Sequence, residues 1–115
     1  MIWSASPKEY VDPIIDCLEI RPYVKQVLCK ENCTFDQKLS VIYKNLDNLN
    51  RPLDKIIIID NSKDCYFRHP TNGIEIKEYD GDKDQCLLTL AKYLSHFAKN
   101  GYQIEKLVHE WSASV

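Results

Sequence analysis

The sequence predicts an α/β fold with a central parallel sheet that is covered by helices. Residues 56–59 are four isoleucines in a row, and such a β-branched run without alternation indicates a buried central strand. Helical patterns lie on both sides of this run along the chain, and strands that alternate with helices are typical of a parallel α/β sheet. With 115 residues, the chain has room for one domain with one hydrophobic core.

Composition and charge exclude several classes of partner. Apolar residues make up 44% of the chain and charged residues 28%, which is ordinary for a globular protein, and the formal net charge is −2. Without a basic excess, we expect no nucleic acid or membrane partner. The five cysteines form no C-x-x-C pair, so we expect structural thiols in the nucleus or cytoplasm, with a zinc site or a disulfide as the alternatives.

The first half of the chain is expected to hold a strand, a helix and several short segments. Residues 2–5 read as the end of a buried strand. Ser6 and Glu9 then predict a capping box at the start of a helix, in which Pro13 predicts a kink. The apolar face of this helix is predicted to consist of Tyr10, Val11, Ile14, Ile15 and Leu18. After it we expect a short strand at 26–29, a turn at 30–32, a short strand or extended segment at 39–44, and a helical turn with a loop at 45–51.

The second half is expected to add one strand and two helices after the isoleucine run. Residues 73–79 read as the strand and residues 80–82 as a turn. A helix over residues 83–99 is predicted to be capped by Asp82 and Gln85 and to stop at Gly101. Its predicted apolar stripe is Leu87, Leu90, Ala91, Leu94, Phe97 and Ala98, and the last helix carries Ile104, Leu107, Val108 and Trp111 at helical spacing.

Two places follow predicted strands and carry polar side chains. Ligands of open α/β sheets bind at the carboxyl ends of strands. Ser4 and Ala5 lie where the first strand passes into a helix, so the Ser4 hydroxyl and nearby backbone N–H groups could hold a phosphate oxygen. Asp60 and Asn61 offer the hard oxygen ligands that Mg²⁺ prefers, and Lys44 offers a cation upstream. Each has an ordinary alternative: Asp60 as a turn residue, and Lys44 as a solvated surface lysine.

Six segments appear in a fixed order: residues 2–13 (IWSASPKEYVDP), 28–35 (LCKENCTF), 43–46 (YKNL), 49–53 (LNRPL), 56–62 (IIIIDNS) and 69–72 (HPTN). They resemble the motifs F-T-A-S-x-x-x-Y-A-D-P, L-x-R-E-x-C, V-K-D-L, L-G-R-D-L, D-N-S and H/Q-P-x-N of the FCP/SCP-type phosphatases. This family, also called NLI-interacting-factor-like, belongs to the haloacid dehalogenase (HAD) superfamily. The resemblance implies a HAD-like three-layer sandwich.

The resemblance also implies roles for the candidate residues. Ser4, Ala5 and Lys44 stand where the family binds phosphate, Asp60 and Asn61 where it holds Mg²⁺, and Ser4, Lys44 and Asp60 are the implied catalytic residues. The implied activity is Mg²⁺-dependent hydrolysis of phosphoserine or phosphothreonine in a protein, such as the RNA polymerase II C-terminal domain or a regulatory protein.

The family's nucleophile motif, D-x-D-x-T/V, occurs nowhere in the 115 residues. We therefore expect residues 1–115 to be the C-terminal two-thirds of a phosphatase domain whose first strand, and with it this motif, lies upstream of Met1. Such a chain should be poorly folded and inactive by itself, because the lost strand would sit between those ending at Ser4 and Asp60.

Two other functions remain open at this point. One is a non-catalytic binding module similar to the mitochondrial inner-membrane presequence translocase receptor, which residues 49–51 and 55–60 also resemble. Asn61 and Ser62 after Asp60 favour the phosphatase instead. The other is a pseudophosphatase that acts as a scaffold.

Overall fold

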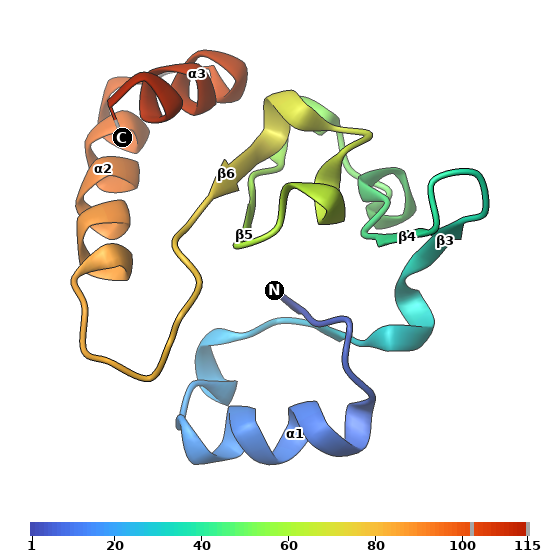
Figure 1. The fold of residues 1–115 in the computed structure, drawn as a ribbon. Coiled ribbons are helices and arrows are strands. Elements are labelled where there is room, and N and C mark those ends of the chain that lie inside the picture. Colours follow the sequence, from blue (N-terminus) through green and yellow to red (C-terminus); the bar gives the residue numbers. More distant parts are fainter. Residues whose placement is uncertain (102, 115) are drawn as a thin grey trace. The chain divides into compact units, whose positions relative to one another are not determined.

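The computed structural model describes residues 1–101 and 103–114, with only the backbone of residues 113 and 114. It is a mixed α/β structure with short strands (Figure 1). The chain divides into two compact units, Met1–Asn45 and Leu46–Val115. Within the described ranges the strands form three separate two-stranded sheets, so the expected single central sheet is not what these residues build.

The first unit begins with a parallel strand pair joined by a helix. Strand β1 (Ile2–Trp3) pairs with β2 (Val27–Leu28) in the register Ile2↔Val27, and helix α1 (Lys8–Cys17) lies between them in the chain. Both strands were predicted, and both are shorter than expected. Val11 and Ile15 of α1 are buried with Cys29 in a small core against Ile2 and Val27.

Helix α1 differs from its prediction at its start and on its apolar face. The capping box of Ser6 and Glu9 is wrong, because Pro7 occupies the N-cap position in an extended conformation and no side chain caps the helix. This moves the helix start one residue beyond the reach of Ser6. Of the expected apolar face, Tyr10, Ile14 and Leu18 are exposed. Pro13 lies inside the helix, and its kink stays a prediction.

An antiparallel hairpin ends the first unit. Strand β4 (Val41–Tyr43) confirms the short strand expected at 39–44, whereas its partner β3 (Thr34–Asp36) was not predicted. The Asp36 carboxylate accepts the Leu39 N–H at 2.9 Å, and Ser40 takes a positive φ of 52°. The hairpin turn is therefore made by local side-chain chemistry that strand propensity does not reveal.

The second unit contains the parallel pair β5 (Ile58–Asp60) and β6 (Gly73–Glu75), in the register Ile58↔Gly73 and Asp60↔Glu75. Strand β5 begins two residues later than the isoleucine run and includes Asp60. Ile59 is 41% exposed, so the prediction that both faces of this strand are covered is wrong. Strand β6 is shorter than the expected 73–79, although the Ile76 N–H still donates to the Asp60 carbonyl at 3.0 Å.

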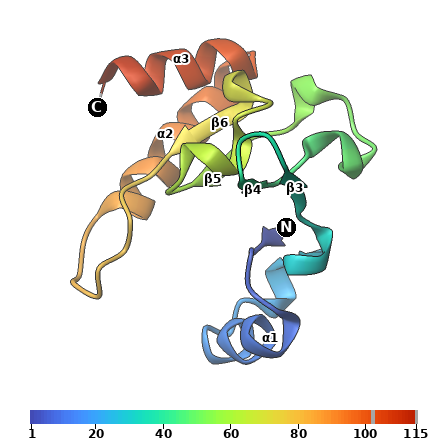
Figure 2. The ribbon, with the colours of Figure 1, turned by 45° about the vertical axis from the view of Figure 1, so that its right-hand side comes forward.

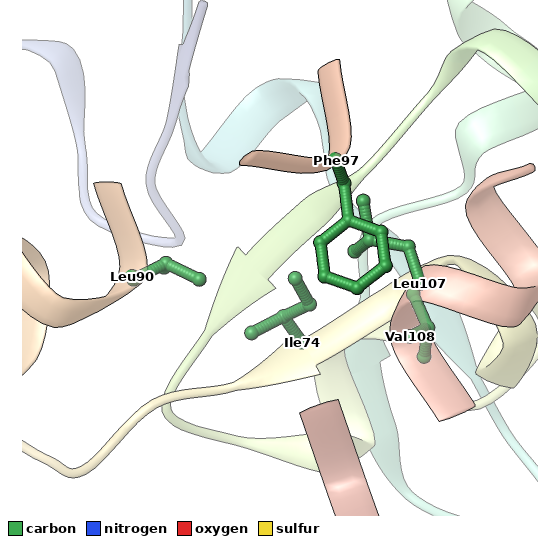
Figure 3. Close-up of a cluster of buried hydrophobic side chains, with 5 residues drawn as sticks. All are labelled: Ile74, Leu90, Phe97, Leu107 and Val108. Carbon is green, nitrogen blue, oxygen red and sulfur yellow. The ribbon is translucent and has the colours of Figure 1, made fainter. Parts of the chain in front are cut away.

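Helices α2 (Cys86–Asn100) and α3 (Ile104–Ser114) lie beside β6 in both ribbon views (Figures 1 and 2). Their apolar faces meet Ile74, which is fully buried, in a core of Ile74, Leu90, Phe97, Leu107 and Val108 (Figure 3). The Tyr93 hydroxyl donates to the Leu107 carbonyl at 2.6 Å and ties the two helices together.

The predicted start and stop of α2 have different outcomes. Gly101 has φ 65° and donates to the Phe97 carbonyl, so the glycine stop is confirmed. The start is wrong, because Gln85 occupies the N-cap without a side-chain bond and the Asp82 N–H instead donates to the Asp80 carboxylate. Leu87 is 68% exposed, which makes the buried stripe narrower than predicted.

Short 3₁₀ turns connect these elements. They span Arg21–Tyr23, Lys30–Asn32, Leu46–Leu49, Leu53–Lys55, Lys63–Tyr66 and Pro70–Asn72. The turns at Lys30–Asn32 and Leu46–Leu49 confirm the predicted turn and helical turn. None of the helices in the described part of the chain is both long and apolar enough to cross a membrane.

Candidate functional site

The loop after β1 holds Ser4 in a defined position. The Ser4 N–H donates to the Leu28 carbonyl at 3.0 Å and so extends the pairing with β2. Its hydroxyl oxygen accepts the Ser6 N–H at 3.1 Å, and the Ser6 carbonyl accepts the Lys30 N–H at 3.0 Å. Ser4 is half-buried, whereas Ala5 is exposed at the tip of the loop. The hydroxyl therefore forms a hydrogen bond within the loop and does not cap α1.

The segment after β2 contacts this loop through hydrogen bonds. The Cys33 thiol lies 3.9 Å from the Ser4 carbonyl and 3.8 Å from the Cys29 carbonyl, which are weak hydrogen bonds. The Asn32 amide oxygen accepts the Cys29 N–H at 2.9 Å and fixes the turn. The L-x-R-E-x-C resemblance implied no role for this segment. In the structure the segment anchors the Ser4 loop.

Cys29 is a structural residue of this anchor. It is 3% exposed, and burial raises the pKa of its thiol, with the charge of Glu31 adding to the effect. A buried neutral thiol is a poor nucleophile. We therefore assign Cys29 no chemical role.

Lys44 is buried, which overturns its alternative interpretation as a solvated surface lysine. It follows β4 directly, and only 7% of the residue is exposed. Burial of an ammonium group is costly unless it is paired or hydrogen-bonded. Its position thus fits a lysine that serves a site more closely than one that solubilises a surface.

Asp60 ends β5 and is 8% exposed. Its Oδ1 accepts the Ser62 N–H at 3.0 Å, which fixes the carboxylate by a local turn, and its carbonyl accepts the Ile76 N–H. Asn61 is exposed beside it. The turn interpretation is therefore correct for Asp60, and the same turn also holds a carboxylate at the carboxyl end of a strand, where ligands bind in α/β folds.

Tyr66 and Gly73 pack together next to Asp60 and were not singled out by the sequence. Tyr66 is 5% exposed, and a Cβ atom built on Gly73 would lie 2.0 Å from its Cε2 atom. Burial, together with the negative charges of Glu75 and Asp60, raises the pKa of Tyr66 to about 12. Its hydroxyl is therefore neutral at physiological pH.

Asn72 connects three segments of the second unit. It is 6% exposed, and its side-chain amide donates to the Leu53 carbonyl at 2.7 Å and to the Ile56 carbonyl at 2.9 Å. These bonds hold the residues that lead into β5. The resemblance contained the H/Q-P-x-N motif without a role, and the structure makes its asparagine a clamp behind the strand that carries Asp60.

Asp60 and Asn61 are the residues that the sequence predicts to hold Mg²⁺. Among residues 1–101 and 103–114, no three His, Cys, Asp or Glu side chains gather in a way that could hold an ion. Asp60 and Asn61 supply two oxygen donors of the kind that Mg²⁺ takes, whereas its octahedral shell needs about six. They therefore fit one side of a magnesium site. Ser4, Ala5 and Lys44 belong to the first unit and Asp60 and Asn61 to the second, so their assembly into one site stays a prediction.

Comparisons with known proteins agree on a family. The family model described as NLI interacting factor-like phosphatase matches residues 1–105. A probable C-terminal domain small phosphatase of Dictyostelium discoideum is 36% identical over 100 residues, which cover 86% of this chain. The human carboxy-terminal domain RNA polymerase II polypeptide A small phosphatase 2 is 35% identical over 91 residues, or 78% of the chain.

A relative whose name gives a different role is similar to a comparable extent. The mitochondrial import inner membrane translocase subunit TIM50 of Candida glabrata is 32% identical over 99 residues, which cover 85% of this chain. The matched regions span 32%, 33% and 20% of these three relatives, in the order given. The chain thus corresponds to about a third or less of each.

Proposed function

Because the chain belongs to the NLI interacting factor-like phosphatase family, we propose that the full-length protein hydrolyses phosphoserine or phosphothreonine in a protein substrate with the help of Mg²⁺. The observation that carries the proposal is Asp60, a nearly buried carboxylate that ends β5 and is fixed by the Ser62 N–H. Most aspartates at turns are solvated, whereas this one is held in place at a strand end.

In this proposal the chain's own residues hold the phosphate and the metal. The Ser4 hydroxyl and the backbone N–H of the exposed Ala5 bind phosphoryl oxygens, and the buried Lys44 ammonium neutralises their charge. Asp60 and Asn61 would hold Mg²⁺, which supplies further positive charge for the phosphoryl group. Phosphoryl transfer depends mainly on such positioning and charge stabilisation.

The nucleophile belongs to a segment outside these 115 residues. The D-x-D-x-T/V motif is absent from the chain, and the chain matches only 20–33% of the length of the relatives described above. We place the motif upstream of Met1, on a strand that completes the sheet of a HAD-like sandwich. Residues 1–115 are then the C-terminal part of the phosphatase domain and catalyse no turnover without that segment.

The names of the relatives support a choice of substrate. Two of them are C-terminal domain small phosphatases, and one name specifies RNA polymerase II. The proposal therefore names a phosphorylated protein tail, such as that domain, or a phosphorylated regulatory protein as the substrate. The corresponding location is the nucleus or cytoplasm.

The test measures hydrolysis of an aryl phosphate by the full-length protein with Mg²⁺ and with EDTA. Turnover should require Mg²⁺, and Asp60→Asn should lower it by at least about 100-fold, in the range found when one charge-stabilising group is removed. Asp54→Asn is the matched control, because Asp54 is an exposed aspartate of the same unit. Metal-independent turnover, or equal losses in the two variants, would contradict the proposal.

A non-catalytic binding module is the second candidate, favoured by the 32% identity with the translocase subunit TIM50. It would recognise an unphosphorylated peptide segment, and under this alternative the location would be the mitochondrial inner membrane. A full-length protein that carries the D-x-D motif, folds and still hydrolyses no aryl phosphate would favour this module or a pseudophosphatase scaffold.

A further inference from the structure

A pocket of about 430 Å³ lies directly beside Asn61, within the second unit. Its walls come from the segment that follows β6 and from the first turn of α2, which Figure 1 shows joined by a long connection. The volume falls in the range of ~300–1,000 Å³ that is usual for ligand pockets. Asn61 is one of the two residues proposed to hold Mg²⁺. Atoms that flank the phosphate of a substrate bound at that site would therefore lie at the pocket.

The pocket is mainly apolar and open to solvent. Ile76, Tyr79 and Leu87 line it, and Tyr79 is 72% and Leu87 68% exposed. Leu87 lies on the predicted apolar stripe of α2, yet its neighbour Leu90 enters the core and Leu87 does not. An apolar wall beside a polar site indicates a ligand with an apolar part next to its charged part.

The charged residues around the pocket determine which substrate side chain it favours. Lys77 contributes one positive charge, whereas Glu78 and Asp84 contribute two negative charges. The Cys86 N–H donates to the Asp84 carboxylate at 2.9 Å, which lowers the pKa of Asp84 and keeps it ionised. Burial, followed by the contact with Asp84, raises the pKa of the Cys86 thiol, so the thiol adds no charge to the pocket. The acidic excess opposes an acidic residue next to the phosphate.

We infer that this pocket receives an uncharged, apolar or aromatic side chain that lies close in sequence to the phosphorylated residue of the protein substrate. The inference rests on the proposed function, because Asn61 places the pocket beside the phosphate only if Asp60 and Asn61 belong to the phosphatase site. It adds a preference for substrate sequence and assigns this preference to the segment between β6 and α2.

The test is a series of phosphoserine peptides given to the full-length protein. A single leucine is moved through the positions on either side of the phosphoserine in an alanine background, and aspartate replaces it in a second series. At one position leucine should raise kcat/KM about 10-fold over alanine, mainly through KM, because one filled apolar pocket gives this degree of discrimination. Aspartate at that position should lower kcat/KM below the alanine value.

Leu87→Ser is the diagnostic variant, and Leu88→Ser is its matched control. Leu88 is the next residue, is similarly exposed at 59%, and lies outside the pocket lining. The leucine-to-alanine ratio of kcat/KM, measured within each variant, should fall to about one in Leu87→Ser and stay unchanged in Leu88→Ser. Both side chains are exposed, and a ratio within one variant cancels any loss of folded protein.

The possible outcomes separate the pocket from the activity. If the wild-type protein hydrolyses aryl phosphate but shows no leucine preference, or loses it equally in both variants, the inference is wrong and the proposed function stands. If aryl phosphate is not hydrolysed, the proposed function fails and the inference falls with it. If sedimentation shows that Leu87→Ser dissociates a dimer, a second copy of the chain covers the pocket, and the inference is overturned.

Discussion

Replacement of Gly73 by alanine tests how tightly the start of β6 is packed against Tyr66. A Cβ atom on Gly73 would lie 2.0 Å from Cε2 and 2.1 Å from Cδ2 of Tyr66. Carbon atoms in contact are usually ~3.5–4.0 Å apart, so the ring would have to move by about 1.5 Å. Tyr66 is 5% exposed and has little room for that movement.

The expected cost follows from these distances. Overpacking of this kind costs about 1–3 kcal/mol, and the short contact places Gly73→Ala in the upper part of that range. Gly73 has φ −99° and ψ 131°, which alanine adopts readily, so alanine recovers about 0.4–1 kcal/mol by restricting the unfolded chain. The net loss should be about 2 kcal/mol, or a fall in Tm of roughly 8–16 °C.

Urea unfolding, followed by the fluorescence of Trp111 in a Trp3→Phe background, measures this loss. Trp111 reports on the second unit because its ring packs against Tyr93 at 4.9 Å. In a Tyr66→Val background the aromatic ring is gone, and Gly73→Ala should become neutral or slightly stabilising. Gly101→Ala is the control, since Gly101 has φ 65° and no neighbour within 4 Å, so its cost should be the same with or without Tyr66.

Equal costs of Gly73→Ala in the two backgrounds would refute the reasoning. The loss would then come from the backbone and not from the Tyr66 ring. A cost for Gly101→Ala that depends on Tyr66 would show that the background itself disturbs the unit.

Three further predictions concern residues around the candidate site. Asn72→Ala should lower the free energy of unfolding by about 1–3 kcal/mol in urea titrations, because the buried Ile56 carbonyl and the part-buried Leu53 carbonyl lose their donor. The exposed Asn100→Ala should cost less than about 0.5 kcal/mol. Folding raises the pKa of Tyr66 from its ordinary value of 10.0 to about 12. Its neutral hydroxyl therefore contributes fully to stability below pH 10, and this contribution is lost as the pH rises towards 12. Tyr66→Phe should remove that part of the alkaline loss in unfolding measurements, and an unchanged slope would contradict the assignment. Cys33→Ala should raise KM for aryl phosphate roughly threefold, the size of one weak hydrogen bond, and Cys33→Ser should restore it; a change in kcat alone would argue against a role in positioning the Ser4 loop.

Local patterns predicted most elements of this chain but not their limits. The isoleucine run predicted a strand because β-branched residues favour one, yet Ile59 is exposed and Asp60 belongs to the strand. Strand propensity describes the preference of a single residue, whereas burial of its side chain depends on which segments pack over the strand. The same holds for Leu87, which has the spacing of a core residue but lies beyond the reach of Ile74 and its neighbours.

Contacts between distant segments were outside the reach of the sequence. The clamp made by Asn72 joins residues 16 and 19 positions away, and nothing in the H-P-T-N segment specifies those partners. Gly73 reads as an ordinary strand glycine until the ring of Tyr66 is seen where its Cβ would be. The positions of Ser4 and Asp60 at strand ends were predictable, since that rule depends only on where a strand stops.

The carboxylate of Asp60 separates the two candidate functions by a comparison of stability with activity. Asparagine has the same shape, and its amide oxygen can still accept the Ser62 N–H, so the local turn survives in Asp60→Asn while one negative charge leaves a residue that is 8% exposed. The free energy of unfolding should therefore fall by no more than about 0.5–3 kcal/mol, which leaves a protein of ordinary stability folded. If the chain is part of a phosphatase, turnover should nevertheless collapse, because the lost charge is the one that attracts Mg²⁺. A binding module would stay folded and keep its peptide affinity, since binding an unphosphorylated segment does not require Mg²⁺ at that carboxylate. A variant that unfolds would refute both expectations and would make Asp60 a structural residue.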